Sequence, residues 1–323
     1  MLIFGAWGKT GINCFVLITG YFMCKSNITA KKFAKLFFEI MLYRILFYFV
    51  FMLSGYESLS LKVFVKAFVP IIDVSSGFDG AFLIFYLFIP FLNILIKSID
   101  EKQHIKLLFL LGFTYVFFGT VPFFSVKMNY VSWFCVLYLI ASYIRLYPKS
   151  IFENTRFWGC ASLITLTVSC ISIIACTYVN KMFGILNSYY FVSDSNTLLA
   201  LLLGLCSFMF FKNLNIKNNM LINKISSSTF GVLLIHAGSD TMRRWLWRDT
   251  LNNLGAYETK WAVWHAVGSV LAVYIICTLI DAVISQLIKK PIFKLWDKYW
   301  DNILKRYTVF ENKFFEKIIR KTE

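Results

Sequence analysis

Charged residues are scarce in this sequence, because Asp, Glu, Lys and Arg make up only 15% of its 323 residues. Soluble globular domains carry about a quarter of their residues as charged side chains. Hydrophobic residues account for 59% and aromatic residues for 19%, with 35 Phe among them. One soluble core has no use for so many apolar side chains. The composition therefore excludes an ordinary soluble domain and predicts surfaces that face lipid.

Several signatures of soluble enzymes are also absent. The chain has no Walker A, GxGxxG, HExxH or GxSxG pattern, which argues against P-loop, Rossmann, zincin and α/β-hydrolase chemistry. It has three His and no cluster with the spacing of metal ligands, so we expect no metal. Its eight Cys are scattered singly and form no CxxC pair, as small hydrophobic residues in a bilayer would be. No cleavable signal peptide, internal repeat or second soluble domain is visible.

Long apolar stretches dominate what is present. A membrane-spanning helix needs about 20 mostly apolar residues. Nine candidates cover residues 3–24, 36–54, 80–98, 105–125, 129–147, 157–180, 196–212, 228–247 and 262–288. We therefore predict an all-α, polytopic membrane helix bundle of about nine transmembrane helices within residues 1–288. The stretch 59–72 is too short to span and carries Lys62 and Lys66, so it is expected at the interface.

The net charge of +16 would suggest nucleic-acid binding in a soluble protein. Here most Lys and Arg fall in alternate loops, at residues 25–35, 97–106, 145–156, 212–224 and after 288. Cytoplasmic loops of membrane proteins collect Lys and Arg. We therefore predict a multi-pass protein of the cell membrane, with its N-terminus outside, its C-terminus cytoplasmic and no nucleic-acid partner.

Residues 289–323 have a different pattern. Apolar and aromatic side chains recur every three or four residues, with Lys and Arg between them. This pattern predicts a basic amphipathic tail helix that lies on anionic membrane lipids at the inner leaflet. A solvated charged helix is the alternative. Asp281, near the end of the last predicted span, is expected to pair with Lys289 or Lys290.

Four stretches, in order, resemble the membrane acyltransferase-3 family. They are residues 11–24, which close on Thr19-Gly20-Tyr21, residues 83–93, residues 133–145 and residues 227–236. Members of this family are integral-membrane acyltransferases, many of which O-acetylate bacterial surface polysaccharides. The resemblance implies a transferase of the bacterial inner membrane. It would move an acetyl or other acyl group from acetyl-CoA or another acyl-CoA to a hydroxyl of a surface polysaccharide or its lipid-linked precursor.

Two features depart from the family pattern. The family begins with a further helix that carries an Arg and a His, and no such helix precedes the first apolar run here. We therefore expect the family's first transmembrane helix to be missing, an expectation that the outside position of Met1 also favours. Where the family often has two Arg before its third helix, this chain has Lys31, Lys32 and Lys35. Lysine supplies charge without the bidentate fork of arginine.

Cations near the cytoplasmic side are the predicted donor-binding residues. Lys31, Lys32 and Lys35 lie beside a helix start, and the first and last of them share a face. Arg44 lies inside a predicted span, where an ionisable side chain is costly and suggests function. The resemblance implies that these four residues bind the phosphates of the acyl-CoA. The alternatives are ordinary positive-inside charge for the lysines and a structural role for Arg44.

His236 is the predicted catalytic base, because it is the only His near the middle of a predicted span. A neutral imidazole can accept a proton from a sugar hydroxyl. Asp240, four residues later, is predicted to orient it. Arg243 and Arg244 follow towards the outside and are predicted to bind the glycan. A buried His bonded to a neighbouring helix is the alternative.

Two other functions remain open at this stage. A carrier or flippase of a lipid-linked glycan would use Arg44, Arg243 and Arg244 to bind a diphosphate and would need no base. Inverted repeats would favour it, and none is visible. The other alternative is a catalytically inactive, truncated acyltransferase-like protein.

Overall fold

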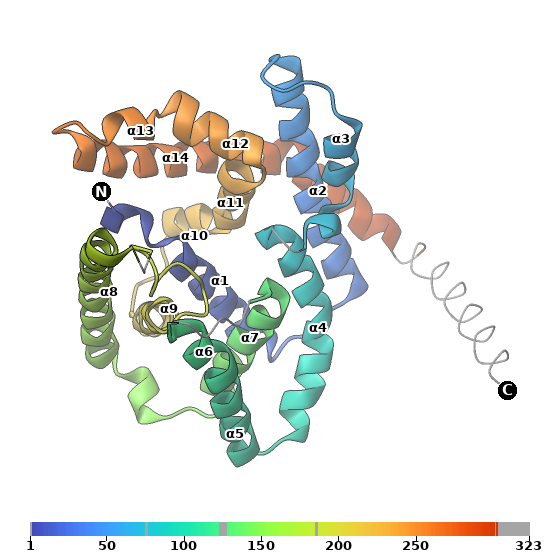
Figure 1. Ribbon diagram of the computed structural model, residues 1–323. Helices are drawn as coiled ribbons and strands as arrows, with labels where there is room; N and C mark the ends of the chain where they lie inside the picture. The colour runs from blue at the N-terminus through green and yellow to red at the C-terminus, as the bar shows by residue number, and fades with distance from the viewer. Residues whose placement is uncertain (1, 75–76, 123–127, 185–186, 301, 303–323) are drawn as a thin grey trace, which may run out of the picture.

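The computed structural model describes residues 2–74, 77–122, 128–184, 187–300 and 302 (Figure 1). Every regular element within these ranges is helical, which confirms the predicted all-α class. The helices are η1 (Leu2–Gly5), α1 (Gly8–Met23), α2 (Ala30–Leu53), α3 (Leu61–Phe68), η2 (Pro70–Asp73), α4 (Phe78–Ser98), α5 (Glu101–Leu111), η3 (Gly112–Phe117), α6 (Phe118–Thr120), α7 (Tyr130–Leu146), η4 (Ser150–Glu153), α8 (Thr155–Phe183), α9 (Leu198–Lys212), α10 (Met220–Ser227), α11 (Thr229–Ala237), α12 (Asp240–Arg244), η5 (Trp245–Thr250), α13 (Asn253–Ala256), α14 (Ala262–Ile284) and η6 (Ser285–Lys289).

The predicted count of nine spans is not confirmed. Four helices in the described residues are long and apolar enough to cross a membrane, namely α2, α4, α8 and the helix Ala262–Trp300. The helices α7 and α9 are apolar but shorter. The predicted span 228–247 is broken between α11 and α12, because Ser239 accepts a hydrogen bond from the Met242 backbone N–H and so caps a new helix.

The last long helix does not end at the predicted boundary of residue 288. It continues to Trp300 through the π-turn η6. Pro291 lies two residues after this turn, and a proline ring crowds the carbonyl four residues before it. The predicted amphipathic tail thus begins as a direct extension of α14. Of that tail, residues 301 and 303–323 lie outside the described residues.

The buried apolar residues form two main clusters. The larger one joins α1, α4, α7 and α9 around Trp133, Phe134 and Tyr138. The second joins α2, α11, α12 and α14 around Ile40 and Tyr43. In Figure 1 α1 and α7 run through the middle of the molecule, and α14 lies across the top of the view above α11. The bundle therefore has two packed halves that meet along α1, α2, α4 and α11.

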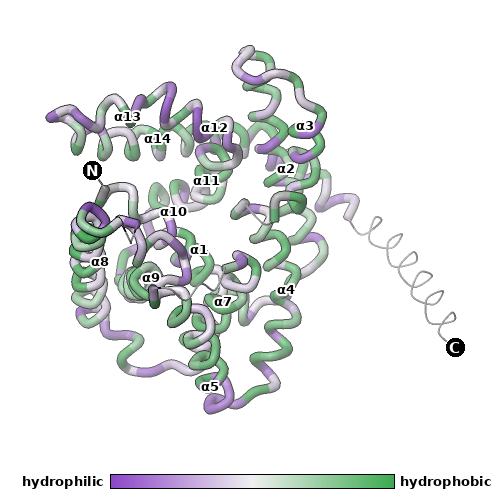
Figure 2. Tube along the Cα trace, viewed as in Figure 1, coloured by the Kyte–Doolittle hydropathy of each residue, from purple (hydrophilic) through white to green (hydrophobic). Residues whose placement is uncertain are grey.

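The traces of α4, α8 and α14 are coloured largely hydrophobic in Figure 2, and many of their apolar side chains are exposed. On α8, for example, Leu163, Ile164 and Ile174 are exposed. A helix that is apolar on its exposed face as well as on its packed face is typical of a membrane span. This surface agrees with the lipid-facing composition predicted from the sequence.

Loops of the predicted cytoplasmic set contact one another. Lys149 and Glu101 form an ion pair of 2.5 Å, and Asn213 donates to the Phe152 carbonyl at 2.8 Å. The Lys149 ammonium holds the pKa of the Glu101 carboxyl below its usual value. We call the end of the bundle formed by residues 24–29, 99–101, 146–155 and 212–219 the basic end. Its loops come from distant parts of the sequence and meet at one end of the bundle.

Candidate functional site

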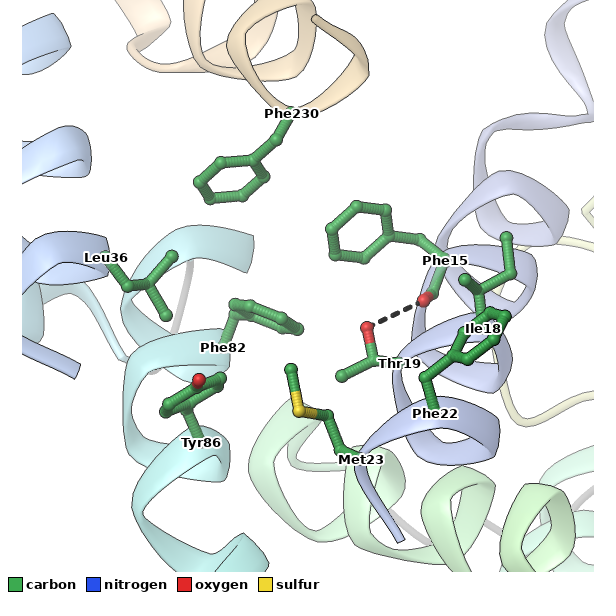
Figure 3. Close-up of a pocket in the computed structure, with 9 residues that line it drawn as sticks. All are labelled: Phe15, Ile18, Thr19, Phe22, Met23, Leu36, Phe82, Tyr86 and Phe230. Carbon is green, nitrogen blue, oxygen red and sulfur yellow. Dashed lines mark hydrogen bonds between the residues drawn. The ribbon is translucent and has the colours of Figure 1, made fainter. Parts of the chain in front are cut away.

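An apolar cavity of about 320 Å³ lies where the two halves of the bundle meet (Figure 3). It is lined by residues of α1, α2, α4 and α11, namely Phe15, Ile18, Thr19, Phe22, Met23, Leu36, Phe82, Tyr86 and Phe230. The Thr19 hydroxyl donates to the Phe15 carbonyl of its own helix at 3.0 Å. The lining contains no carboxylate, imidazole, ammonium or guanidinium group. The cavity is therefore suited to hydrocarbon, and Thr19 and Tyr86 are the lining residues with polar side-chain groups.

His236 lies in the last turn of α11 and is partly exposed. Its Nδ1 is 2.6 Å from the Val232 carbonyl oxygen in the preceding turn. A carbonyl only accepts, so Nδ1 carries a proton and the neutral ring has its lone pair on Nε2. The ring meets Trp247 edge to face, with centroids 6.5 Å apart. Within the described residues Nε2 has no protein partner, which leaves it available as a base.

Asp240 does not contact His236, and the prediction that it orients this ring is not met. Its carboxylate pairs with Arg243 at 2.5 Å, and both side chains are exposed. The chain turns at the Ser239 cap, so His236 and Asp240 lie on two helices instead of one regular turn apart. Arg244 is also exposed on α12. The predicted glycan-binding pair thus reaches the surface, and one of its members is already bound to a carboxylate.

The three lysines of the predicted donor site lie together at the start of α2. Lys31 and Lys35 both contact the Asp297 carboxylate, at 2.7 Å and 2.8 Å. Lys32 donates to the Asn27 carbonyl at 2.9 Å. Asp297 belongs to the extension of α14, so the beginning of the predicted tail places one carboxylate against two of the three cations. These groups are partly exposed, and an ion pair of this kind is weak enough to exchange its partner.

Arg44 lies apart from these lysines. It forms a bidentate pair with Asp79, with Nε–Oδ2 and Nη2–Oδ1 distances of 2.8 Å and 2.9 Å, and Nη1 donates to the Lys66 carbonyl at 3.2 Å. Both side chains of the pair are about nine-tenths buried. Nine residues of helix separate Lys35 from Arg44, about 13 Å along the axis. Arg44 therefore ties α2 to α3 and α4, and releasing it would leave Asp79 as an uncompensated buried charge.

A second buried ionic network joins α2 to the end of α14. The Lys289 ammonium is 2.9 Å from Glu39 Oε1 and 2.9 Å from Asp281 Oδ1. The Tyr43 hydroxyl also donates to Asp281. The expected pairing of Asp281 with Lys289 or Lys290 is thus confirmed for Lys289, and it is joined by Glu39, whose partner the sequence did not indicate. Gly231 of α11 abuts the network, because a Cβ atom there would lie 2.0 Å from Asp281 Oδ1.

The π-turn η6 explains why Asp281 and Lys289 meet. Residues eight apart on a regular α-helix are rotated by about 80° from each other. A π-turn takes up one additional residue, so the pair is related as residues seven apart would be. That spacing returns to nearly the same face of a helix. The irregular turn before Pro291 therefore directs Lys289 into the bundle.

Sequence reasoning missed a cationic group at the basic end. The Arg145 guanidinium carbon lies 4.7 Å from the ring centroid of Tyr21, and Nη1 donates to the Tyr21 hydroxyl at 2.9 Å. The Lys212 ammonium lies 5.9 Å from the same centroid. Tyr21 and Arg145 belong to two of the four stretches that resemble the family. The presence of both in such stretches was the one available signal, but it did not indicate that they meet.

Gly20 lets α1 and α7 approach closely enough for this contact. A Cβ atom at Gly20 would lie 2.9 Å from Ala141 Cβ and 3.0 Å from Tyr138 Cα. Small residues allow such close crossings between membrane helices. Asn93 of α4 fastens the same region, because it donates to the Met23 carbonyl at 3.3 Å and accepts from the Tyr138 hydroxyl at 2.6 Å. The Thr-Gly-Tyr segment therefore positions the end of α1.

We expect Gly20→Ala to lower the free energy of unfolding by about 1–3 kcal/mol, because the backbone of α7 must move to admit the new methyl group. This loss opposes the gain of about 1 kcal/mol that alanine has over glycine inside a helix. Thermal unfolding of the purified protein in detergent measures the effect. Gly11→Ala on the same helix is the matched control, since nothing lies within 4 Å of a Cβ there. Equal melting temperatures for the two variants would contradict the close crossing.

Comparison with known families covers most of the chain. A family model of the acyltransferase-3 type, described as an acyltransferase domain, matches residues 1–282. The search of curated proteins and the search of solved structures returned no match. The matched range contains all four stretches that resemble the family, together with His236, Arg145 and the start of the ionic network. On this match the chain belongs to the acyltransferase-3 family of membrane acyltransferases.

Proposed function

We propose that the protein transfers an acetyl or other acyl group from acyl-CoA to a hydroxyl of a cell-surface polysaccharide or its lipid-linked precursor. The family match over residues 1–282 is the observation that carries the proposal. The apolar helices support a site within a membrane. We further propose that this is the bacterial inner membrane, with the basic end towards the cytoplasm, where acyl-CoA is available.

The reaction needs one base. The acceptor hydroxyl oxygen attacks the thioester carbonyl carbon, the carbon–sulfur bond breaks, and the CoA thiol leaves with the proton that the hydroxyl loses. His236 supports this step through the geometry of its ring, since Val232 holds the proton on Nδ1 and Nε2 is left to accept one. We propose that His236 takes the hydroxyl proton and returns it to the departing thiolate.

The structure weighs against the carrier alternative. That function requires Arg44, Arg243 and Arg244 as a group that binds a diphosphate. Arg44 is held by Asp79 inside the bundle, and Arg243 contacts Asp240 on α12. Two of the three arginines thus already bind carboxylates, in different parts of the protein.

An acyl-transfer assay on purified protein in liposomes tests the proposed function. With radiolabelled acetyl-CoA and a lipid-linked oligosaccharide extract, we expect label in the glycan fraction and one free CoA thiol for each acyl group transferred. Heat-denatured protein in the same liposomes is the control. If folded protein neither transfers label nor releases CoA with any acyl-CoA or extract tried, the inactive alternative replaces this proposal.

A further inference from the structure

Two cations without a carboxylate partner converge on one aromatic ring at the basic end. Arg145 lies in the last turn of α7, Lys212 is the last residue of α9, and Tyr21 lies near the end of α1. The two cationic groups are 4.7 Å and 5.9 Å from the Tyr21 ring centroid. Neither forms an ion pair within the described residues, and the Lys212 ammonium donates only to Asn213 Oδ1, at 2.6 Å.

Arg145 is under-used as a hydrogen-bond donor. A guanidinium carries five N–H groups, and the structure gives this one a single bond, from Nη1 to the Tyr21 hydroxyl. Its Nε is shielded from solvent and has no partner in the described part of the chain. A buried N–H without an acceptor is destabilising. The Nε–H group of Arg145 can therefore still donate a hydrogen bond to an oxygen of a ligand.

Three lysines near this end are already paired with carboxylates. Lys31 and Lys35 contact Asp297, and Lys149 contacts Glu101. Cations at helix C-termini also interact favourably with the helix dipole, but that effect does not require two of them to meet on a ring of a third helix. The side chain of Arg145 reaches across to α1 and does not bond the terminal carbonyls of α7.

We propose that Tyr21, Arg145 and Lys212 form a binding site for phosphate groups at the basic end of the bundle. The Tyr21 ring and hydroxyl hold the guanidinium by a cation–π contact and a hydrogen bond. The planar set of guanidinium donors matches two phosphate oxygens. Lys212 adds a second positive charge on the same ring, which suits a ligand with more than one negative charge.

Two sources supply this chemistry, the phosphates of CoA and the headgroup of an anionic lipid. The CoA source rests on the proposed function. With CoA as the ligand, the nucleotide of the donor lies at the ends of α1, α7 and α9, away from the lysines that contact Asp297. The lipid source does not depend on any reaction.

Binding of CoA to the purified protein in a zwitterionic detergent, followed by isothermal titration calorimetry, tests the first source. Arg145→Gln and Lys212→Gln are each expected to raise the Kd at least tenfold, and binding should weaken as salt is added. Arg145→Lys keeps the charge but not the fork and should have an intermediate Kd. Arg156→Gln is the matched control, because Arg156 is an exposed cation at the same end, and its Kd should stay within twofold of the wild-type value.

The lipid source is tested by melting the same variants in nanodiscs of phosphatidylglycerol or phosphatidylcholine. A higher melting temperature in phosphatidylglycerol that is lost in Arg145→Gln and Lys212→Gln, but kept in Arg156→Gln, supports a headgroup in the site. If neither CoA affinity nor this lipid effect depends on Arg145 or Lys212, the proposal is overturned. A protein that binds CoA through these residues but transfers no acyl group would retain the site and lose the proposed function.

Discussion

Replacing His236 with glutamine is expected to lower the rate of acyl transfer by about 100- to 10,000-fold, the usual contribution of a positioned general base. Glutamine keeps an N–H group that can donate to the Val232 carbonyl, but it has no nitrogen that can accept the hydroxyl proton. The loss should appear in kcat, because the ring lies on α11 and not among the cations proposed to bind the donor. Release of free CoA thiol in liposomes, with acceptor extract present, measures the rate.

His265 provides the matched control for this variant. It lies near the start of α14 with its Nδ1 3.5 Å from the Ser269 hydroxyl, and His265→Gln should transfer at a rate within twofold of wild type. The two variants should also melt within a few degrees of the unchanged protein. Wild-type activity in His236→Gln would remove this residue from the mechanism. A lower rate accompanied by a clearly lower melting temperature would assign it a structural role.

The largest expected effect on stability comes from Lys289→Met. Without the ammonium, the carboxylates of Glu39 and Asp281 face each other in the bundle with no cation between them. Breaking a buried pair in this way costs about 3–5 kcal/mol. We expect a correspondingly lower melting temperature in detergent, by far the largest change among single substitutions on this helix.

Lys290→Met is the control, since Lys290 is the adjacent residue and is exposed. It should melt within about 1 °C of wild type, as surface substitutions usually do. Adding Glu39→Gln and Asp281→Asn to Lys289→Met removes the two orphaned charges and should recover part of the lost stability. If Lys289→Met and Lys290→Met melt alike, the network seen between α2 and the end of α14 does not hold the bundle together.

Local patterns predicted more of the fold than of the site. The expected pairing of Asp281 with a nearby lysine was correct for Lys289, although the π-turn η6, and not regular helix spacing, brings the two residues together. The prediction for Asp240 failed for a related reason. It assumed one regular helix from His236 onward, and the Ser239 cap interrupts that helix. Which residues share a face can be predicted from spacing only while a helix remains regular.

Contacts between helices were outside the reach of such reasoning. Arg44 was predicted beside the lysines of α2, but its partner Asp79 begins another helix, and it contributes to packing. Tyr21 and Arg145 are 124 positions apart in the sequence, and they meet only because Gly20 lets their helices cross closely.

Composition and the order of apolar runs were enough to predict a helical membrane protein, because burial in lipid requires apolar side chains and satisfied backbone hydrogen bonds along every span. These are properties that neighbouring residues share. Which charges lie buried, which cations are neutralised and which remain open to a ligand depended on the tertiary structure. The reason is that the energy of a charge in a low-dielectric interior is set by groups within a few ångströms of it, and in this bundle many of those groups come from distant helices.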